Sequence, residues 1–286
     1  MYRNNSYGSN PISFEELEIK NKKVNTKEYV KALNVIIAGS IGCKFALVCG
    51  LSSFTLSYLK KICKVPLKSF IIQVYGSSCS GKSTFGRLAA SVYANPYKES
   101  GLFRSWHGTT ASILKSLDGN HGIVRVFDES EFCNLDQWKA IYEFIEVENS
   151  NQCNTILSIG EGSILSGFSR SEAYLRLLEF LNLSITQNAA HNDKIQQFIA
   201  NNYGVIASVL CHEMIECNDD KGIEEKYNEF KYDLESKVSE KGGLSNDAII
   251  SIYSVLMVSA HLLTEIGISI DIPEIEKLLL QHYKNL

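Results

Sequence analysis

The sequence predicts an α/β fold, in which a mostly parallel sheet lies between helices and is flanked by N- and C-terminal helical regions. Three observations favour this class. Short apolar runs alternate with helical patterns from residue 70 to 185, which is typical of strands joined by helices. Only long helical patterns follow after that point. The apolar run at 70–75 leads directly into GSSCSGKS, a segment of small residues with one lysine.

The same patterns divide the chain into four parts. Residues 1–16 are polar and rich in Asn and Ser, and we expect them to form a flexible tail. Residues 17–69 are mostly helical in pattern, with a break near Pro66. Residues 70–185 are expected to form the α/β core, and residues 186–286 a C-terminal helical region packed on it.

The elements of the core follow from periodicity and from turn residues. Short apolar runs predict strands at 70–75, 102–107, 123–128 and 154–160. The run at 174–183 suits a strand or a helix, and we prefer the strand. Helical spacing predicts helices at 81–94, 109–119 and 135–149. Pro96 limits the first of these helices, while a threonine at the start and a glycine at the end suit the second.

The composition is ordinary for a soluble globular chain, since 45% of the 286 residues are hydrophobic and 21% are charged. A net charge of −4 excludes a global attraction to nucleic acid or to an anionic membrane. The eight cysteines form no CxxC pair, so we expect a reducing, cytoplasmic setting without disulfides. Lys44 near the middle of the apolar stretch 35–53 favours a buried helix or helical hairpin over a membrane span.

The small-residue segment matches the phosphate-binding loop (P-loop) pattern GxxxxGK[ST]. Small residues let the backbone curl around a phosphate, whose charge is bound by backbone N–H groups and by the start of the following helix. Lys82 is expected to reach the β- and γ-phosphates, and the Ser83 hydroxyl to hold Mg²⁺. The candidate nucleotide-binding residues are Gly76, Ser77, Ser78, Cys79, Ser80, Gly81, Lys82, Ser83 and Thr84.

An acidic pair follows the predicted strand IVRVFDE. We expect Asp128 to bind Mg²⁺ through water and Glu129 to orient or deprotonate the attacking water. Glu131 is a nearby alternative for the base. A turn or a helix cap is the structural alternative for such a pair, and its position after a P-loop favours the functional one.

Two further roles have candidates. Ser158 in TILSIGE is expected to act as a sensor that contacts the γ-phosphate or the water, with a plain strand end before a turn as the alternative. An arginine is needed to neutralise charge in the transition state. Arg170 and Arg176 are the candidates, each able to act on a neighbouring subunit's nucleotide, and surface ion pairs are the alternative for both.

These segments together resemble a known family. VYGSSCSGKSTFGRLAASVYANP, SWHGTTASILKSL, IVRVFDE, TILSIGE, LRLLEFL, NNYGVIASVL and IYSVLMVSAHLLTEIGI follow one another in its order. The chain resembles, over roughly residues 28–285, the domain-of-unknown-function family 927, P-loop ATPases of phages and mobile elements usually described as helicase-like. The resemblance implies a P-loop NTPase core of the AAA+ or helicase type. The family's glycine- and arginine-rich stretch after the acidic pair is absent from this chain.

The resemblance also implies site residues. The family's P-loop falls on Gly76, Gly81, Lys82 and Ser83, and its acidic pair on Asp128 and Glu129. Its turn after the next strand falls on Ile159-Gly160-Glu161, and its helical threonine on Thr109 or Thr110. The arginine that opens the family's following strand matches Arg176, which ranks that residue above Arg170.

Three functions are weighed on these grounds, all using ATP and Mg²⁺. The first is a helicase-like ATP hydrolase, an oligomeric motor on nucleic acid, with 132–138 as one loop for single-stranded DNA. The second is a regulatory or remodelling ATPase that acts on a partner protein, for example in antiphage defence, without unwinding DNA. The third, a small-molecule kinase, is disfavoured because the acidic pair suits water activation. The expected partners are a nucleotide, single-stranded DNA, further copies of the chain and a partner protein, but no membrane.

Overall fold

The computed structural model describes most of the chain, and the predicted tail at 1–16 lies outside the described residues. These residues are 25–98, 101–118, 122–146, 154–167, 175–217, 220–240 and 246–284.

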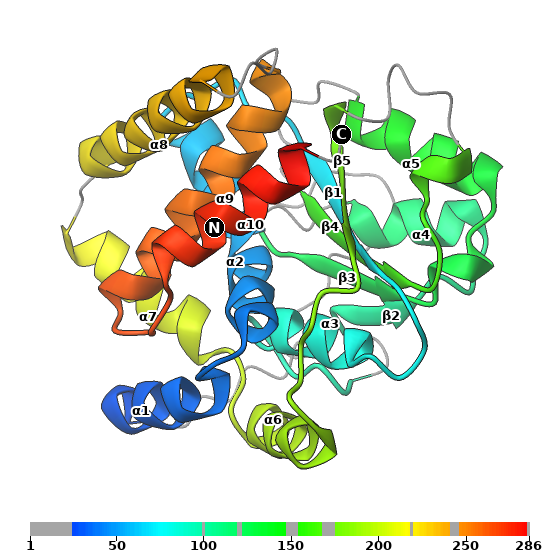
Figure 1. Cartoon of the computed structure of the whole chain (residues 1–286), viewed down its shortest axis with the longest axis horizontal. Coiled ribbons are helices and arrows are strands. Elements are labelled where there is room, and N and C mark those ends of the chain that lie inside the picture. Colours follow the sequence, from blue (N-terminus) through cyan, green and yellow to red (C-terminus); the bar gives the residue numbers. More distant parts are fainter. Residues whose placement is uncertain are drawn as a thin grey trace.

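A five-stranded sheet forms the centre of the molecule (Figure 1). Its strands are β1 (Phe70–Tyr75), β2 (Phe103–Ser105), β3 (Arg125–Asp128), β4 (Thr155–Gly160) and β5 (Leu177–Leu181). They lie in the order β2-β3-β4-β1-β5, and all four pairings are parallel. The predicted α/β class is therefore confirmed. Because the strands are parallel, their carboxyl ends all meet at one edge of the sheet.

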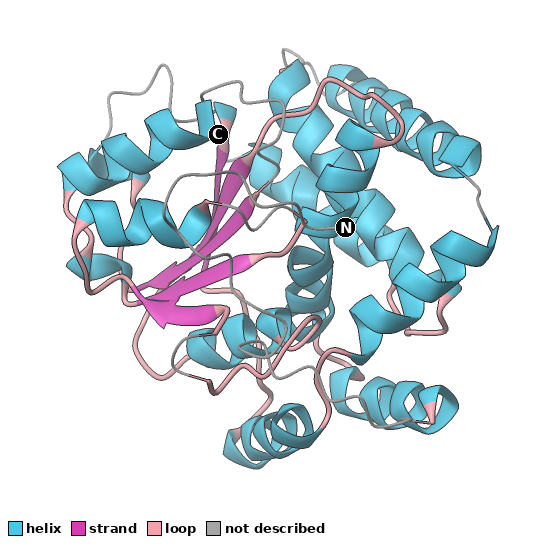
Figure 2. Ribbon diagram, turned by 180° about the vertical axis from the view of Figure 1, so that it is seen from behind, coloured by secondary structure: helices cyan, strands magenta, loops and turns pink. Residues whose placement is uncertain are grey.

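Helices cover both faces of this sheet (Figure 2), as parallel sheets require. The connecting helices are α3 (Lys82–Ala90), α4 (Thr110–Leu117) and α5 (Leu135–Glu146). Thr109 caps α4, its side chain accepting a hydrogen bond from the Ser112 backbone N–H, as its position predicts. On the α4–α5 face the buried side chains form a separate apolar cluster that includes Trp106, Ile113, Phe127, Trp138 and Ile141.

The remaining helices precede and follow the sheet. They are α1 (Thr26–Ile37), α2 (Ile41–Lys61), α6 (Ala189–Asn201), α7 (Val205–Cys217), α8 (Asp220–Glu240), α9 (Asp247–Glu265) and α10 (Ile272–Lys284). α2 packs against α3 and α9, and α9 also packs against α8 and α10. The buried Ser259 hydroxyl in α9 donates a 2.8 Å hydrogen bond to the Thr55 hydroxyl in α2. These contacts join both helical regions to one face of the sheet through a single core.

The apolar stretch at 35–53 contains the junction of two helices. α1 ends at Ile37, Gly39 has a φ of 71°, and the Ser40 side chain caps α2. In the described part of the chain, α2 and α9 are long and apolar enough to cross a membrane, but 72% of the apolar window of each is buried inside the protein. Lys44 forms a 2.8 Å ion pair with Glu274 in α10. Both helices are therefore largely buried in the core. For α2, this is the buried helix expected for the stretch 35–53.

Candidate functional site

The P-loop segment connects β1 to α3 at the carboxyl edge of the sheet. Its backbone needs glycine at both ends. Gly76 has a φ of 149°, and a Cβ there would collide with the Asn182 side chain. Gly81 has a φ of 86° and is the N-cap of α3, while Cys79 between them has a φ of 61°. These left-handed positions curl the loop over the start of α3, so the strand–loop–helix context expected from the sequence is present.

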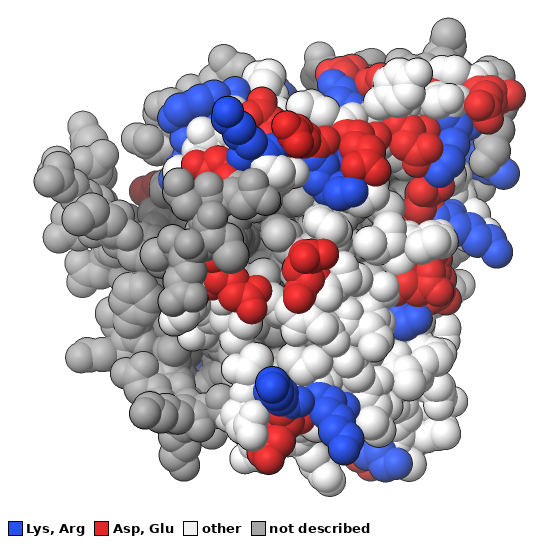
Figure 3. All heavy atoms as spheres, turned by 90° about the vertical axis from the view of Figure 1, so that its left-hand side faces the viewer, with Lys and Arg blue, Asp and Glu red and all other residues white. Residues whose placement is uncertain are grey.

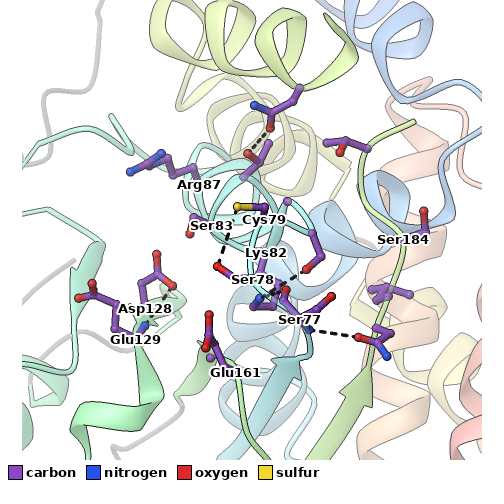
Figure 4. Close-up of a pocket in the computed structure, with 18 of the residues that line it drawn as sticks. Ser77, Ser78, Cys79, Lys82, Ser83, Arg87, Asp128, Glu129, Glu161 and Ser184 are labelled. Carbon is purple, nitrogen blue, oxygen red and sulfur yellow. Dashed lines mark hydrogen bonds between the residues drawn. The ribbon is translucent and has the colours of Figure 1, made fainter. Parts of the chain in front are cut away.

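Lys82 is folded back over this loop (Figure 4). Its Nζ donates hydrogen bonds to the carbonyl oxygens of Gly76 at 3.0 Å and Ser77 at 2.6 Å. A longer bond of 3.4 Å joins it to the Ser80 hydroxyl. The ammonium group thus lies against the backbone of the loop that precedes it.

The two predicted metal ligands line the same cavity. The Ser83 hydroxyl is near enough to the Asp128 carboxylate to lower its pKa, although β4 separates β3 from the strand that carries the loop. The backbone N–H of Glu129 donates to Asp128 Oδ1 at 3.0 Å. Burial raises the pKa of Asp128 and the charge of Glu129 adds to this, while the Ser83 hydroxyl, the Glu129 N–H and the Arg87 charge oppose it. A hydroxyl and a carboxylate side by side match the oxygen donors that Mg²⁺ prefers.

Glu129 is held by the end of β2. The residue adopts a left-handed backbone conformation with a φ of 65° and a ψ of 53°, which is uncommon outside glycine. The Ser105 hydroxyl donates a 2.6 Å hydrogen bond to Glu129 Oε2 and accepts one from the His107 backbone N–H at 3.1 Å. The carboxylate is exposed but tethered, and its direction is set by the neighbouring strand.

One cavity of about 930 Å³ includes these groups. Asp128 and Glu129 lie on one side of the loop and Ser184 on the other (Figure 4). The lining residues predicted from the sequence are Ser77, Ser78, Cys79, Ser80, Gly81, Lys82, Ser83, Thr84, Asp128, Glu129, Glu131, Gly160 and Glu161. The P-loop, the acidic pair and the turn after β4 therefore converge on a single space large enough for a nucleotide.

Sequence reasoning missed the opposite wall of the cavity. This wall follows β5 and continues into α6, and its polar residues are Asn182, Ser184, Thr186, Asn188, Asn192 and Gln196. Thr84 Oγ1 donates a 2.5 Å hydrogen bond to Asn192 Oδ1, which ties the start of α3 to α6. The backbone N–H of Asn182 donates to the Tyr75 carbonyl at 2.8 Å. Only the pairing of β5 beside β1 brings this segment to the loop, so no local signal reveals it.

Arg87 is a further cavity residue that was not predicted from the sequence, although its spacing from the P-loop indicates that it lies near the cavity. It lies three residues after Thr84 on the same helix, and therefore near the same face. It lines the cavity, and its charge lowers the pKa of Asp128. Its guanidinium carbon lies 5.2 Å from the ring centre of Tyr97 and 5.0 Å from that of Phe103. Two aromatic rings therefore hold this cation beside the acidic pair.

Ser158 is not brought into the cavity. It lies inside β4, which continues to Gly160, and its side chain is 0% exposed. Its Oγ accepts a 2.9 Å hydrogen bond from Trp106 Nε1. The side chain belongs to the α4–α5 face of the sheet because residues alternate between faces along a strand. Gly160 and Glu161 reach the cavity at this strand end instead.

Arg176 lies at the opposite edge of the sheet, because it precedes β5 whereas the cavity lies beyond the strand ends. Its Nε forms a 2.6 Å ion pair with Glu146, and its NH1 donates to the Ile145 carbonyl at 3.1 Å. The side chain is only 9% exposed. Arg176 therefore forms a largely buried ion pair, not the surface ion pair considered as its alternative, and does not reach the cavity of its own chain. Its action on a neighbouring subunit's nucleotide stays a prediction. Arg170 lies outside the described residues.

Comparison with known proteins assigns the chain to a family. The sequence profile described as "Domain of unknown function (DUF927)" matches residues 4–152, which include the P-loop segment and the acidic pair. A solved structure titled "SCCmec type IV Cch - active helicase" has a TM-score of 0.79 and 25% sequence identity. The likeness covers 91% of this chain and 50% of that chain, so this chain spans half of that protein's length. A search of curated proteins found no match. The fold is thus helicase-like, and the chain belongs to the DUF927 family.

Proposed function

We propose that this protein is a Mg²⁺-dependent ATP hydrolase of the helicase-like P-loop class, a cytoplasmic oligomeric motor acting on nucleic acid. One observation carries the proposal: Lys82, Ser83, Asp128 and Glu129 line one cavity at the carboxyl edge of the sheet. The likeness to a structure titled as an active helicase supports the choice of motor.

The donor set suits a magnesium ion. Ser83 and Asp128 would hold it, directly or through water. When bound, Mg²⁺ would neutralise the negative charge that develops on the phosphates. Both side chains line the same cavity, which supports this assignment.

The protein's own groups would perform the remaining steps. Lys82 would exchange its two carbonyl acceptors for phosphate oxygens, while the loop N–H groups bind the same anion. Glu129 would take one proton from the attacking water as the water oxygen bonds to the γ-phosphorus. The bond between the γ-phosphorus and the bridging oxygen breaks, and ADP leaves with those electrons. Glu129 Oε2 accepts a hydrogen bond from the Ser105 hydroxyl, and in this proposal the bond restrains the movement of Glu129 toward that water.

Arg87 would supply positive charge on the Asp128 side of the cavity. Among the residues that the structure describes, it is the arginine that lines this space. Arg176 would act on a neighbouring copy only after losing its ion pair with Glu146. We therefore propose that the charge provided within one chain comes from Lys82 and Arg87.

Phosphate release from ATP tests the proposal. We would measure turnover with Mg²⁺, with and without single-stranded DNA, in the wild type and in Lys82→Ala. Lys277→Ala, an exposed lysine in α10, serves as the matched control. Lys82→Ala should lose turnover by at least about a hundredfold, because a charge aimed at the transferred phosphate disappears. Equal rates in Lys82→Ala and the wild type would refute ATP hydrolysis at this cavity.

A second function, remodelling of a partner protein, is favoured by the surface charge. The chain has a net charge of −4. Acidic and basic side chains are intermingled on the face in Figure 3, including the upper band where α8 lies. Such a surface gives no broad attraction to phosphates. Turnover that single-stranded DNA leaves unchanged would favour this function over the nucleic-acid motor.

A further inference from the structure

Two aromatic side chains form an exposed pair near the acidic residues. The ring centres of His107 and Phe132 lie 3.9 Å apart, with an angle of 36° between the ring planes. His107 follows β2, and Phe132 ends the short 3-10 helix η1 (Ser130–Phe132) after β3. Phe132 is 49% exposed, and the nearby Leu135 is 39% exposed. We call His107 and Phe132 the aromatic pair.

The neighbouring aromatic residues on these segments are buried. Trp106, adjacent to His107 in the chain, is 0% exposed and stacks on Phe127 with ring centres 4.2 Å apart. The same indole lies 4.5 Å from the ring centre of Trp138 and donates its N–H to Ser158. Trp106 therefore anchors this segment in the core, while the ring of the adjacent His107 is exposed to solvent. Leaving half of a phenylalanine in water costs hydrophobic free energy that binding a flat apolar surface would recover.

We propose that the aromatic pair binds an unstacked base of single-stranded nucleic acid, an inference that rests on the proposed motor function. A nucleobase has the planar face that two adjacent rings can bind by stacking, and every base offers one. A duplex keeps those faces covered, so single strands are the matching form. Asp136 and Lys139 nearby are both exposed and of opposite charge. Stacking, rather than phosphate neutralisation, therefore supplies the binding at this place.

The position of the aromatic pair connects it with the acidic residues. His107 is two residues after Ser105, and its backbone N–H donates to the Ser105 hydroxyl. That hydroxyl holds Glu129, which lies three residues before Phe132. A base bound on the exposed face of these rings would be expected to shift both segments that position Glu129. Base binding is therefore expected to change ATP turnover.

Binding of a fluorescent oligo(dT) strand to the full chain tests the inference. Anisotropy titrations at low and high salt would compare the wild type with Phe132→Ala, Phe132→Trp and Tyr232→Ala. Tyr232 in α8 is 77% exposed and serves as an aromatic control away from the sheet edge. Phe132→Ala should weaken binding roughly 5- to 100-fold, the contribution of one stacked base. The factor should be equal at both salt concentrations, because stacking releases no counterions. Phe132→Trp should restore binding, and Tyr232→Ala should bind as the wild type does.

Other outcomes separate this inference from the proposed hydrolysis. Unchanged affinity in Phe132→Ala, a loss that disappears at high salt, or an equal loss in Tyr232→Ala would overturn the aromatic pair as a base-binding site. A wild type that hydrolyses ATP without binding oligo(dT) would also overturn it, while ATP hydrolysis stands. A salt-independent loss in Phe132→Ala, combined with turnover that survives Lys82→Ala, would support base binding and refute the proposed hydrolytic site.

Discussion

The Ser105 hydroxyl donates a 2.6 Å hydrogen bond to the carboxylate of Glu129. Ser105 is paired in register with Asp128, so the end of β2 lies directly beside the acidic pair. A hydrogen bond to a charged acceptor is short and directional, so it fixes the direction of the carboxylate. The proposed base is therefore held by the end of β2.

Ser105→Ala should raise DNA-independent ATP turnover. A hydrogen bond to a charged group contributes about 1.5–3 kcal/mol, so its removal should free Glu129 and raise the basal rate roughly fivefold or more. The factor by which single-stranded DNA increases ATP turnover should therefore be smaller in Ser105→Ala than in the wild type. Ser112→Ala, at an exposed serine in α4, is the control. A basal rate at or below that of the wild type would mean that Ser105 does not restrain the base.

Glu129→Gln should abolish turnover while ATP remains bound. The amide keeps the shape of the side chain but cannot accept a proton, and general-base catalysis contributes about 10²–10⁴-fold. Glu131→Gln is the informative comparison, because Glu131 also lines the cavity. Single-turnover hydrolysis and nucleotide-binding titrations would measure both variants. A larger loss in Glu131→Gln would transfer the role of base to that residue.

Replacing Arg125 should stabilise the fold. This side chain in β3 is 1% exposed, and its three guanidinium nitrogens have no hydrogen-bond partner within the described part of the chain. Burial, with a smaller effect of the Arg104 charge, lowers the pKa of Arg125 to about 9. Arg125→Met removes the buried charge and keeps an extended side chain, so the free energy of unfolding should rise by about 1–4 kcal/mol.

Urea unfolding at several pH values would check this prediction. The folded state disfavours the proton on Arg125, which the unfolded chain retains to a higher pH. The buried charge therefore reduces the stability of the wild type by its full amount below pH 9, and by less as the pH rises further. The stability gap between Arg125→Met and the wild type should narrow above pH 9. Equal stability of the two proteins at pH 7 would contradict the account.

The buried His282 should make the fold sensitive to mild acid. Its Nε2 accepts a 3.1 Å hydrogen bond from the Glu179 backbone N–H, so its proton lies on Nδ1, 2.5 Å from the Tyr253 hydroxyl. Burial lowers the pKa of His282 to about 4. The neutral ring contributes fully to the free energy of unfolding above pH 6.5, and this contribution is lost as the pH falls from 6.5 to 4. The free energy of unfolding should therefore decrease by about 3 kcal/mol over that pH range.

Chemical denaturation across this pH range measures the effect. His282→Gln keeps a polar side chain that does not titrate, so its stability should vary less between pH 6.5 and 4 than that of the wild type. Parallel curves for the two proteins would exclude His282 as the source of the acid sensitivity.

The elements of the core were predictable because their signals are local. Short apolar runs predict the strands, and a capping threonine together with helical spacing predicts α4. The region at 174–183 suited either a strand or a helix, and the preferred strand is confirmed by β5. Its place beside β1 depends on long-range pairing, which no window of the sequence contains.

By itself, the sequence determined the phosphate-binding pattern around Lys82 and the acidic pair after β3, because each depends on residue types within a few positions. Only the tertiary structure decided what surrounds them. The strand order brings Ser105 to Glu129 and the segment after β5 to the P-loop. Because side chains alternate between the two faces along β4, the Ser158 side chain points into the core. Because of the direction of β5, Arg176 lies at the edge of the sheet opposite the cavity. Both follow from long-range packing, which local patterns do not specify.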